Sequence, residues 1–454
     1  MEDTKDKFSR RKFIGNAAAI GALGAVGING IISACASETK SKVALPVPLD
    51  EAPDGPLLKA GLIGCGGRGT GAALNFLNAG PNLEIVALGD LFQDQIDKAR
   101  EELKDKKEVE VADEKCFVGF DAFEKVIDSG VDIIILATPP VFRAEHFDAA
   151  IKAKKHVFME KPVAVDPVSA RSIIATAKKA DPLGLCVVAG TQRRHKRDYL
   201  KTYEQILNGE IGDIVAGNCY WNQSKLWHVN RDEGWTDMEY MIRNWVNWTW
   251  LSGDHIVEQH VHNIDVINWF AGKHPVKAVA FGSRLRRITG DQYDNFSVDF
   301  IYDNDMHLHS MCRQIDDCAN SVSEYIRGTK GYTNCENTIY NPDGSVKWTY
   351  EYPPDENGEP TTWVKVNPYD QEHIDLITAI RTNSPINEGE NVATSTLTAI
   401  MGRISAYTGK EVTWDEMMNS DLKLGPDTYV MGPMDMTPNI PLPGTAADEE
   451  QDRG

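Results

Sequence analysis

The feature that most constrains the fold is a glycine-rich segment that separates two short apolar runs. Residues 58–64 are typical of a buried strand, and Gly64-Cys65-Gly66-Gly67-Arg68-Gly69 continues them with the pattern G-x-G-x-x-G. A helical stretch and a second apolar run, 83–88, come next, and Asp90 stands 21 residues after Gly69. This order of strand, glycine loop, helix, strand and acid predicts a unit that binds a dinucleotide.

Each residue of this unit has a physical task. Gly64 permits a tight turn, Gly66 lets the backbone approach a pyrophosphate, and Gly69 lets the helix pack closely on the strand. The N-terminus of the helix offers free N–H groups to the phosphates. Asp90 accepts hydrogen bonds from the adenosine ribose and repels a 2′-phosphate, so NAD is favoured over NADP. The alternative is a glycine-rich turn that holds no ligand.

The alternation of apolar and helical stretches continues to residue 190. Further strands are predicted at 116–118, 131–136, 156–159 and 185–189. The run 131–136 is continuously apolar, as in a parallel strand that is covered on both faces. Thr138 and Pro139 follow it at the carboxyl edge, where such sheets bind ligands. We therefore predict an α/β fold whose first domain, residues 57–190, is a doubly wound parallel sheet of the Rossmann type.

The composition limits the class of protein. The chain of 454 residues is long enough for two or three domains, and its 42% hydrophobic and 25% charged residues exclude collagen, a coiled coil and general disorder. The formal net charge of −20 argues against binding to nucleic acid or to an anionic membrane surface, which needs clustered Lys and Arg. Apart from Cys35, seven cysteines without a C-x-x-C pair predict buried thiols and no disulfide framework.

A tripeptide after the fifth predicted strand makes the fold assignment more specific. Glu160-Lys161-Pro162, together with the glycine loop, Asp90 and Thr138-Pro139-Pro140, resembles the Gfo/Idh/MocA oxidoreductase family over about residues 57–435. The resemblance implies NAD as the cofactor and places Lys161 near the nicotinamide and the reacting hydroxyl group. The expected cofactor contacts are Gly64, Gly66, Gly67, Arg68, Gly69, Asp90, Thr138, Pro139, Glu160 and Lys161. Without the resemblance, the tripeptide is only a turn at the end of a strand.

The family's second signature is an acid, a histidine four residues later and an aspartate three residues after that. Glu258, His262 and Asp265 match it, with Glu258 in the place where the sugar and inositol dehydrogenases usually have Asp. The match implies that His262 is the catalytic acid–base group and that Glu258 orients or polarises it, since residues four apart project from one face of a helix. His255, His260 and His262 raise a metal site as an alternative, but their spacing does not place all three on one helical face, and no metal is predicted.

Candidates for substrate binding come from a basic cluster and from a tryptophan-rich region. Arg193 and Arg194 follow the last predicted strand of the first domain, where they contact substrate or cofactor phosphate or, alternatively, begin a solvated helix. Seven of the ten tryptophans fall between residues 221 and 269, which is typical of an aromatic wall for sugar stacking or of an aromatic core. Trp227, His228 and Trp235 lie in a polar stretch and are the predicted substrate contacts.

Residues 191–435 are predicted to form a second domain of the α+β class. The resemblance implies an open mixed or antiparallel sheet with helices, which binds substrate and joins the subunits of a homo-oligomer. Strand-like runs at 214–221, 276–282, 296–302 and 307–314 support such a sheet. The last residues, 436–454, are predicted to be an acidic tail.

The N-terminus is predicted to direct the protein out of the cytoplasm. Ser9-Arg10-Arg11-Lys12-Phe13-Ile14 resembles the twin-arginine export signal, and a mildly apolar stretch, 14–32, follows it. Ile32-Ser33-Ala34-Cys35 resembles a lipobox, which implies removal of residues 1–34, lipidation of Cys35 and a tether over residues 35–56. The expected location is the periplasm or the membrane surface. The alternatives are a permanent N-terminal helix and ordinary cleavage that leaves Cys35 lost or free.

These features predict an NAD-dependent oxidoreductase that acts on a hydroxyl or keto group of a sugar or glycoside. A redox-neutral glycosidase, which oxidises, eliminates and re-reduces with one tightly held NAD, is the alternative within the family's N-acetylgalactosaminidase branch. The Thr-His-Gly-Leu-Gly-type segment of that branch is missing here. A sugar-binding protein without catalysis is a third reading, against which the presence of Lys161 and His262 argues.

Overall fold

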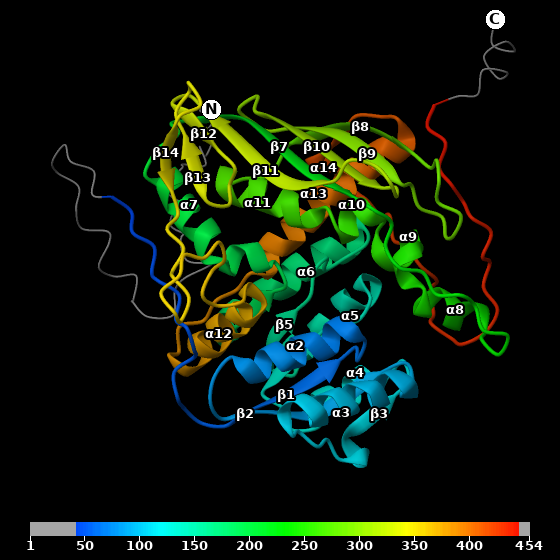
Figure 1. Ribbon diagram of the computed structural model, residues 1–454. Helices are drawn as coiled ribbons and strands as arrows, with labels where there is room; N and C mark the ends of the chain where they lie inside the picture. The colour runs from blue at the N-terminus through cyan, green and yellow to red at the C-terminus, as the bar shows by residue number, and fades with distance from the viewer. Residues whose placement is uncertain (1–41, 445–454) are drawn as a thin grey trace, which may run out of the picture.

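The computed structural model describes residues 42–444, and their strands form two separate sheets (Figure 1). The predicted signal segment 1–34, Cys35 and the part of the tail beyond residue 444 lie outside the described residues. No helix among the described residues is long and apolar enough to cross a membrane.

The first sheet has six parallel strands in the order β3-β2-β1-β4-β5-β6, which is the doubly wound order. The strands are β1 (Leu58–Ile63), β2 (Leu83–Asp90), β3 (Cys116–Val118), β4 (Ile133–Leu136), β5 (His156–Met159) and β6 (Val187–Ala189). All four side chains of β4 are buried, as expected for a central strand with helices on both faces. The chain order reverses direction between β1 and β4, and such a switch point opens a crevice at the carboxyl ends of the strands. The predicted Rossmann fold is confirmed.

Helices cover both faces of this sheet, and one of them comes from the far end of the chain. The helices that follow the strands are α2 (Gly67–Asn78), α3 (Gln93–Lys107), α4 (Ala122–Ile127), α5 (Pro140–Lys152) and α6 (Pro167–Ala180). Helix α12 (Pro368–Arg381) packs with α2 and β6, and its Ile374 and Ile377 belong to the same buried cluster as Phe76. The core of the first domain is therefore not contained in residues 57–190, because α12 completes one of its layers.

The second sheet is mixed and has nine strands in the order β14-β13-β12-β11-β7-β10-β9-β8-β15. These are β7 (Ile214–Gln223), β8 (Lys277–Ser283), β9 (Asn295–Ile301), β10 (His307–Gln314), β11 (Ser321–Gly328), β12 (Gly331–Thr333), β13 (Thr338–Tyr340), β14 (Val346–Thr349) and β15 (Val412–Thr413). Strands β7 and β10 pair in parallel, and the other neighbours pair antiparallel. The predicted open mixed sheet is confirmed.

The helices of the second domain cover one face of its sheet, except the two between residues 237 and 252, which pack on the first domain. They are α7 (Arg197–Leu207), α8 (Asp237–Arg243), α9 (Thr249–Ser252), α10 (His255–Glu258), α11 (Val261–Ala271), α13 (Gly389–Thr408) and α14 (Trp414–Asn419). Figure 1 shows α11 and α13 between this sheet and the first domain. Helix α13 packs on α6 of the first domain and on β8 and β9 of the second, so it belongs to both. Gly402 is required on it, because a Cβ there would lie 2.8 Å from the Phe300 ring.

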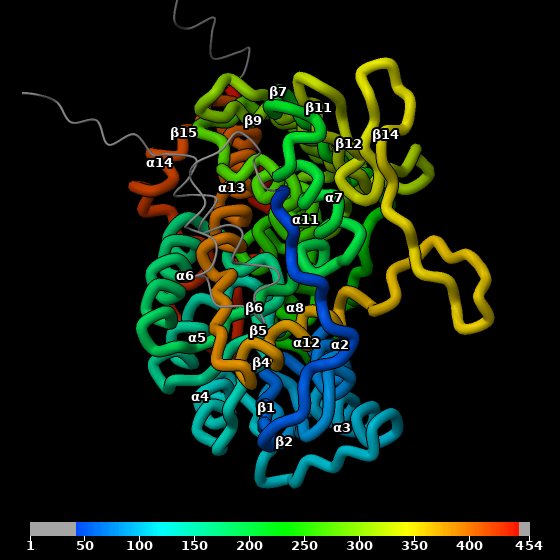
Figure 2. The backbone as a smooth tube through the Cα atoms, turned by 90° about the vertical axis from the view of Figure 1, so that its left-hand side faces the viewer, coloured from blue at the N-terminus to red at the C-terminus, as the bar shows by residue number. Residues whose placement is uncertain are grey.

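Two segments without regular structure run along the outside of the domains: the N-terminal one is visible in Figure 2, and the C-terminal one in Figure 1. Residues 42–56, within the predicted tether, follow α7 and α12: Leu45 N–H donates to Glu204 at 2.6 Å, and Arg381 donates to the Pro53 carbonyl at 2.6 Å. At the other end, Leu424 N–H donates to Asp166 at 2.9 Å. The described part of each segment is therefore fastened to the folded domains.

Candidate active site

The glycine loop has the geometry that phosphate binding requires. Gly64 has a φ of +95°, and a Cβ there would lie 2.6 Å from the Thr138 backbone nitrogen. A Cβ on Gly69 would lie 1.8 Å from the Gly64 carbonyl oxygen, so helix and strand approach closely only without a side chain. A Cβ on Gly67 would meet nothing within 4 Å, and Gly66 caps α2 without a side-chain hydrogen bond. The first turn of α2 is thus open to a ligand of negative charge.

A cavity of about 510 Å³ lies against this loop. Six of the predicted cofactor residues line it: Gly64, Gly66, Gly67, Asp90, Thr138 and Pro139. Asp90 accepts hydrogen bonds from Cys65 N–H at 2.6 Å and from Phe92 N–H at 2.9 Å, which fixes its carboxylate at the end of β2. Burial raises the pKa of Asp90, and these hydrogen bonds oppose the rise. The loop, the carboxylate and the volume together fit the adenosine and pyrophosphate of NAD.

Two other predicted cofactor residues, Arg68 and Glu160, hold each other. Arg68 Nε donates to Glu160 Oε1 at 2.5 Å, and the guanidinium lies 4.8 Å from the centre of the Tyr369 ring. The buried Arg143 donates to the Glu160 carbonyl at 2.7 Å and to the Pro162 carbonyl. The side chains of Arg68 and Glu160 therefore fasten α2 to the tripeptide, and Arg143, which sequence reasoning missed, fixes the turn that carries Lys161.

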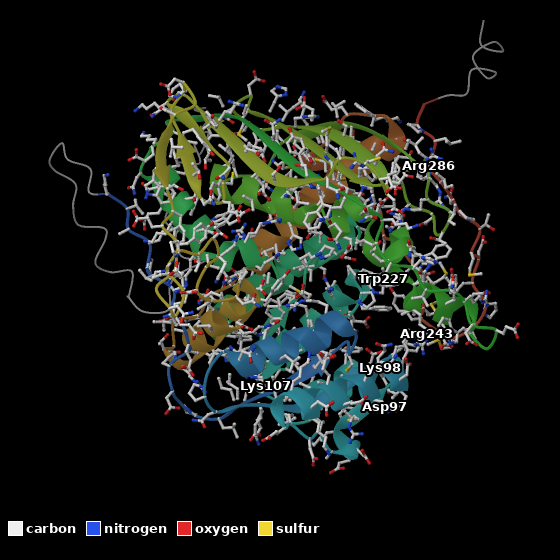
Figure 3. All side chains as sticks on the ribbon, in the orientation of Figure 1. Asp97, Lys98, Lys107, Trp227, Arg243 and Arg286 are labelled. Atoms are coloured by element: carbon white, nitrogen blue, oxygen red, sulfur yellow. The ribbon has the colours of Figure 1, made fainter. Side chains whose placement is uncertain are left out.

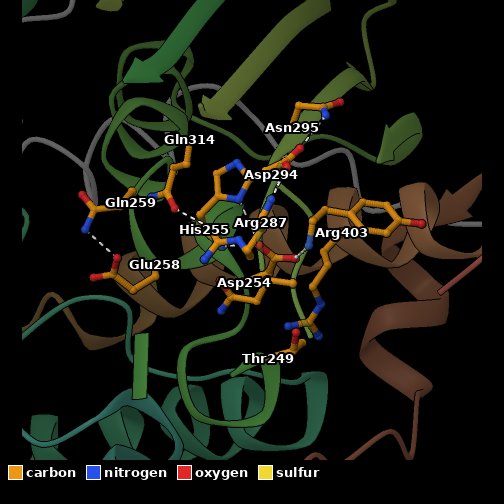
Figure 4. Close-up of polar contacts among 12 residues, drawn as sticks. Thr249, Asp254, His255, Glu258, Gln259, Arg287, Asp294, Asn295, Gln314 and Arg403 are labelled. Carbon is orange, nitrogen blue, oxygen red and sulfur yellow. Dashed lines mark hydrogen bonds and ion pairs between the residues drawn. The ribbon is translucent and has the colours of Figure 1, made fainter. Parts of the chain in front are cut away.

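Lys161 reaches across the domain boundary to Glu258. Its Nζ donates to the Glu258 backbone carbonyl at 2.5 Å and lies 3.3 Å from Glu258 Oε1. The Lys161 side chain is only 10% exposed. Glu258 Oε2 also accepts a hydrogen bond from Gln259 (Figure 4). The carboxylate thus holds the ammonium group of Lys161 in place, whereas the sequence predicted that it would act on His262.

The predicted continuous helix through Glu258 and His262 is wrong. Helix α10 ends at Glu258, and α11 begins at Val261, so the two side chains belong to separate helices. The His262 ring stacks on Trp221 with 5.6 Å between the ring centres and is 7% exposed. Burial, with the positive charges of Lys161 and Arg193, lowers the pKa of His262 well below its ordinary value. This shift favours the neutral form of the imidazole.

The two arginines of the basic cluster have different environments. Arg193 Nε lies 3.6 Å from Glu324, its guanidinium is 5.8 Å from the Trp221 ring centre, and its buried Nη1 has no hydrogen-bond partner among the described residues. The Trp221 Nε1 is likewise buried without a partner among them. Unpaired buried donors are costly, so this pair beside His262 is suited to bind oxygen atoms of a substrate.

Arg194 is a correction to the sequence prediction. It is buried, and its guanidinium makes two hydrogen bonds to Asp265, of 2.8 and 2.9 Å. Asp265 also accepts from Ser395 on α13 at 2.7 Å. A guanidinium whose fork is filled by a carboxylate has no free face for a substrate. Arg194 and Asp265 instead fix α11 against the segment that follows β6.

The residues predicted to contact substrate, Trp227, His228 and Trp235, do not lie beside Lys161 and His262. Trp227 and Trp235 line the cofactor cavity instead, at the side where Arg243 and Lys98 lie (Figure 3). His228 lines a second cavity of about 590 Å³. Trp221, which the sequence reasoning did not single out, is the tryptophan that contacts His262. The signal for it was weak, because a tryptophan near the end of a strand is equally suited to a core.

The histidines that raised the metal alternative have separate partners. His255 Nδ1 lies 3.0 Å from Asp254 (Figure 4), and His260 Nε2 lies 2.6 Å from the Ser310 hydroxyl. His262 faces Trp221. Within residues 42–444, no group of three His, Cys, Asp or Glu side chains is arranged to hold a metal ion.

The fold and the cavity define a two-domain, nicotinamide-dinucleotide-binding oxidoreductase. Comparison with known families agrees: the family described as oxidoreductase with an NAD-binding Rossmann fold matches residues 58–187, and the C-terminal domain of the same family matches residues 199–333. The chain belongs to the Gfo/Idh/MocA family, and its cofactor is NAD.

Individual relatives match over part of their length. Myo-inositol 2-dehydrogenase of Thermotoga maritima is 28% identical over 228 residues, which are 50% of this chain and 59% of that protein. A glycosyl hydrolase family 109 protein of Streptomyces coelicolor is 26% identical over 243 residues, 49% of this chain and 50% of that protein. The chain thus spans about half of the length of these curated relatives.

A solved structure shows the same fold over a larger share of both chains. The scyllo-inositol dehydrogenase from Lactobacillus casei, with bound NAD(H) and scyllo-inositol, superposes with a TM-score of 0.57 at 20% identity. The superposition covers 79% of this chain and 99% of that structure. The shared architecture therefore extends over both domains.

Proposed function

We propose that the protein oxidises a secondary hydroxyl group of a sugar or polyol with NAD, and reduces the ketone in reverse. The observation that carries the proposal is the contact of Lys161 with Glu258 across the domain boundary, close enough to His262 for the charge of Lys161 to lower the pKa of that imidazole. The name of the inositol dehydrogenase relative supports a polyol substrate. NAD, when bound, supplies the hydride acceptor.

The acid–base roles follow from charge and position. Oxidation removes a proton from the hydroxyl oxygen, and the neutral His262 accepts it. Lys161, held by Glu258, presents its positive charge to the same oxygen and stabilises the negative charge that develops there. Arg193, with its unpaired Nη1, binds a neighbouring hydroxyl group and orients the ring of the substrate. Burial of these groups excludes water, which strengthens each interaction.

The experiment is a screen of polyols, sugars and glycosides for reduction of NAD by the purified protein. We expect His262→Ala and Lys161→Ala to abolish turnover with a positive substrate, while circular dichroism and bound NAD stay unchanged. His309→Ala is the matched control, because His309 is exposed on β10, on the face of the sheet away from the helices. Near-normal turnover in either site variant would remove that residue from the mechanism.

Redox-neutral cleavage of a glycoside is the second candidate. It is favoured by the resemblance to the glycosyl hydrolase family 109 protein. The same residues serve it, since a transient oxidation also needs a base at the hydroxyl group and an acid on the return step. Release of an aglycone without net formation of NADH would establish this reaction and exclude simple oxidation.

We propose that the protein forms a homo-oligomer through the outer face of the second sheet. Val279 and Phe281 on β8 point away from the helices, and Phe281 is 72% exposed. Val215 and Tyr325 add apolar surface on the same face. Such exposed apolar area favours association. Sedimentation should show an oligomer that Phe281→Asp dissociates, and a monomeric wild type would contradict the proposal.

We also propose export by the twin-arginine route with a lipid on Cys35. The motif around Arg10 and Arg11 and the segment 32–35 support it, and all of these residues lie outside the described part of the chain. This route carries folded proteins, so NAD can be loaded in the cytoplasm and carried outside. Arg10→Lys with Arg11→Lys should retain the protein in the cytoplasm, and Cys35→Ala should release it from membranes. Unchanged fractionation of both variants would contradict the proposal.

A further inference from the structure

One wall of the cofactor cavity comes from the second domain. Trp227, Trp235 and Trp245, which we call the aromatic wall, follow β7 and flank α8, and all three line the cavity. Aromatic side chains of the first domain line it as well: Phe92, Phe120, Phe123 and Phe142. Lys161 and His262 are not among the lining residues. The aromatic wall is therefore on the adenosine side of the site and not at the reacting carbon.

Arg243, the last residue of α8, joins the aromatic wall to the first domain. Its Nη2 lies 2.8 Å from Asp94 Oδ1 and its Nη1 lies 3.3 Å from Asp94 Oδ2, while Nε donates to Glu239 at 2.9 Å. The guanidinium is 3.8 Å from the centre of the Phe92 ring and 4.8 Å from that of Trp235. Its side chain is only 16% exposed. A two-pronged ion pair combined with stacking on aromatic rings is a strong form of arginine contact.

This ion pair holds the turn that carries Asp90. Asp94 is in the first turn of α3, where the helix dipole also favours its negative charge. The Arg243 guanidinium holds the pKa of the Asp94 carboxyl below its usual value, and Lys98 Nζ lies 3.1 Å from the same carboxylate. Phe92 N–H donates to Asp90 at 2.9 Å. Arg243 therefore holds Phe92 and Asp94, which closely follow the predicted ribose contact, Asp90.

The C-terminal segment supports α8 from outside. Met238 N–H donates to the Gly432 carbonyl at 3.1 Å, and Met434 N–H donates to Asp237 at 3.0 Å. The Tyr429 ring packs on Phe142 of the first domain with 4.9 Å between the ring centres. The same segment is thus bound to both domains, so α8 does not swing away from the first domain without breaking these contacts.

We propose that Arg243 and the aromatic wall form the outer side of the adenosine site and retain NAD(H), because the adenine leaves only after the Arg243–Asp94 pair opens. A purine fits between aromatic rings, which supply flat apolar surface on both of its faces. Opening the site also requires Arg243 to leave the Phe92 ring. The rate of cofactor release is then limited by a motion of α8 and the aromatic wall, and not by the glycine loop alone.

The test is the dissociation rate of NADH, measured by stopped-flow fluorescence after mixing with excess unlabelled NAD. Arg243→Gln should release NADH about tenfold faster than the wild type, and Arg243→Lys should be intermediate, since it keeps the charge but loses the second hydrogen bond. Arg100→Gln is the matched control. Arg100 also forms an ion pair, with Asp113 at 2.7 Å, and it is on α3 like Asp94, but it does not line the cavity. Release from Arg243→Gln within twofold of the wild type, in a protein with unchanged circular dichroism, would overturn the proposal.

ADP-ribose distinguishes the two ends of the dinucleotide, because it carries the adenosine but no nicotinamide. Calorimetric titration should show that Arg243→Gln weakens ADP-ribose and NAD by the same factor. Weakening of NAD alone would place the effect at the nicotinamide end and refute the inference. The inference rests on NAD binding and not on the proposed substrate. Failure of every polyol and sugar to reduce NAD would therefore count against the proposed function while leaving these binding results intact.

Discussion

Replacement of Asp90 by serine should remove the preference for NAD over NADP. In the wild type, the Asp90 carboxylate accepts hydrogen bonds from Cys65 and Phe92 and lines the cofactor cavity. Serine keeps one short acceptor at the end of β2 and removes the negative charge. Lys98 and Arg243 line the same cavity, so positive charge remains there when Asp90 is replaced.

The magnitude follows from the charge that a 2′-phosphate would bring. Two unit charges about 4 Å apart interact by about 4 kcal/mol at an effective dielectric constant of about 20, and by about 1 kcal/mol in bulk water. Asp90 lies between these limits, because it is partly covered and lines an open cavity. We therefore expect the wild type to bind NAD at least tenfold more tightly than NADP, which equals about 1.4 kcal/mol. Asp90→Ser should bring the two affinities to within about threefold of each other.

The assay is calorimetric titration of NAD and NADP at about pH 8, where the Asp90 carboxyl is ionised. Asp97→Ser is the control, since Asp97 is exposed on α3 and does not line the cavity (Figure 3). Equal affinity of the wild type for both dinucleotides would refute the electrostatic argument. A variant that still prefers NAD tenfold would show that another residue selects the cofactor.

Four further results are expected. Arg194→Met leaves Asp265 buried without its partner and should lower the free energy of unfolding in urea by about 3 kcal/mol, with little change in NAD affinity. Because the folded pKa of His262 is lowered, its neutral form persists as pH falls through about 6.5, so kcat/KM for oxidation should stay level from about pH 8 to pH 6, and a half-loss at about pH 6.5 would contradict the assignment. Exhaustive dialysis should leave NAD on the purified protein, and activity that returned only with added NAD would contradict retention. Arg403 on α13 donates to the carbonyls of Val165 and Gly253, near Lys161 and Glu258 in the chain, so Arg403→Met should lower kcat while leaving the dissociation constant of NAD unchanged, and equal loss of both would contradict a positioning role.

The parts of the site that the sequence predicted best lie close together along the chain. The glycine loop and Asp90 belong to one strand–helix–strand unit, whose geometry is local, so their placement around the cavity follows from spacing alone. The position of Lys161 at the end of β5 follows in the same way. Arg193 and Arg194 are neighbouring residues of the same type, so the sequence does not distinguish their roles. Only the distant Asp265, which pairs with Arg194, decides that Arg193 remains free for a ligand.

The parts that were missed depend on residues far apart in the chain. Arg243 and Asp94 are separated by 149 positions, and no local pattern relates them. Helix α12 has an ordinary amphipathic pattern, which does not reveal that it packs in the first domain. The break between α10 and α11 was missed because the residues around it are helix-compatible. Asp254, at a φ of +71°, begins the short helix α10, and its side chain accepts a hydrogen bond from His255 N–H.

A buried guanidinium, that of Arg403, contacts both of the segments that carry Lys161 and Glu258. Lys161 and Glu258 come from different domains, so their contact survives only if the domains keep their separation. Arg403 on α13 donates to the Val165 carbonyl and to the Gly253 carbonyl, each at 2.8 Å. Val165 is four residues after Lys161, and Gly253 is five residues before Glu258. Because α13 also packs on α6 and β8, Arg403 joins the segments of Lys161 and Glu258 to one helix, and a shift of either segment would leave a buried charge with fewer hydrogen bonds.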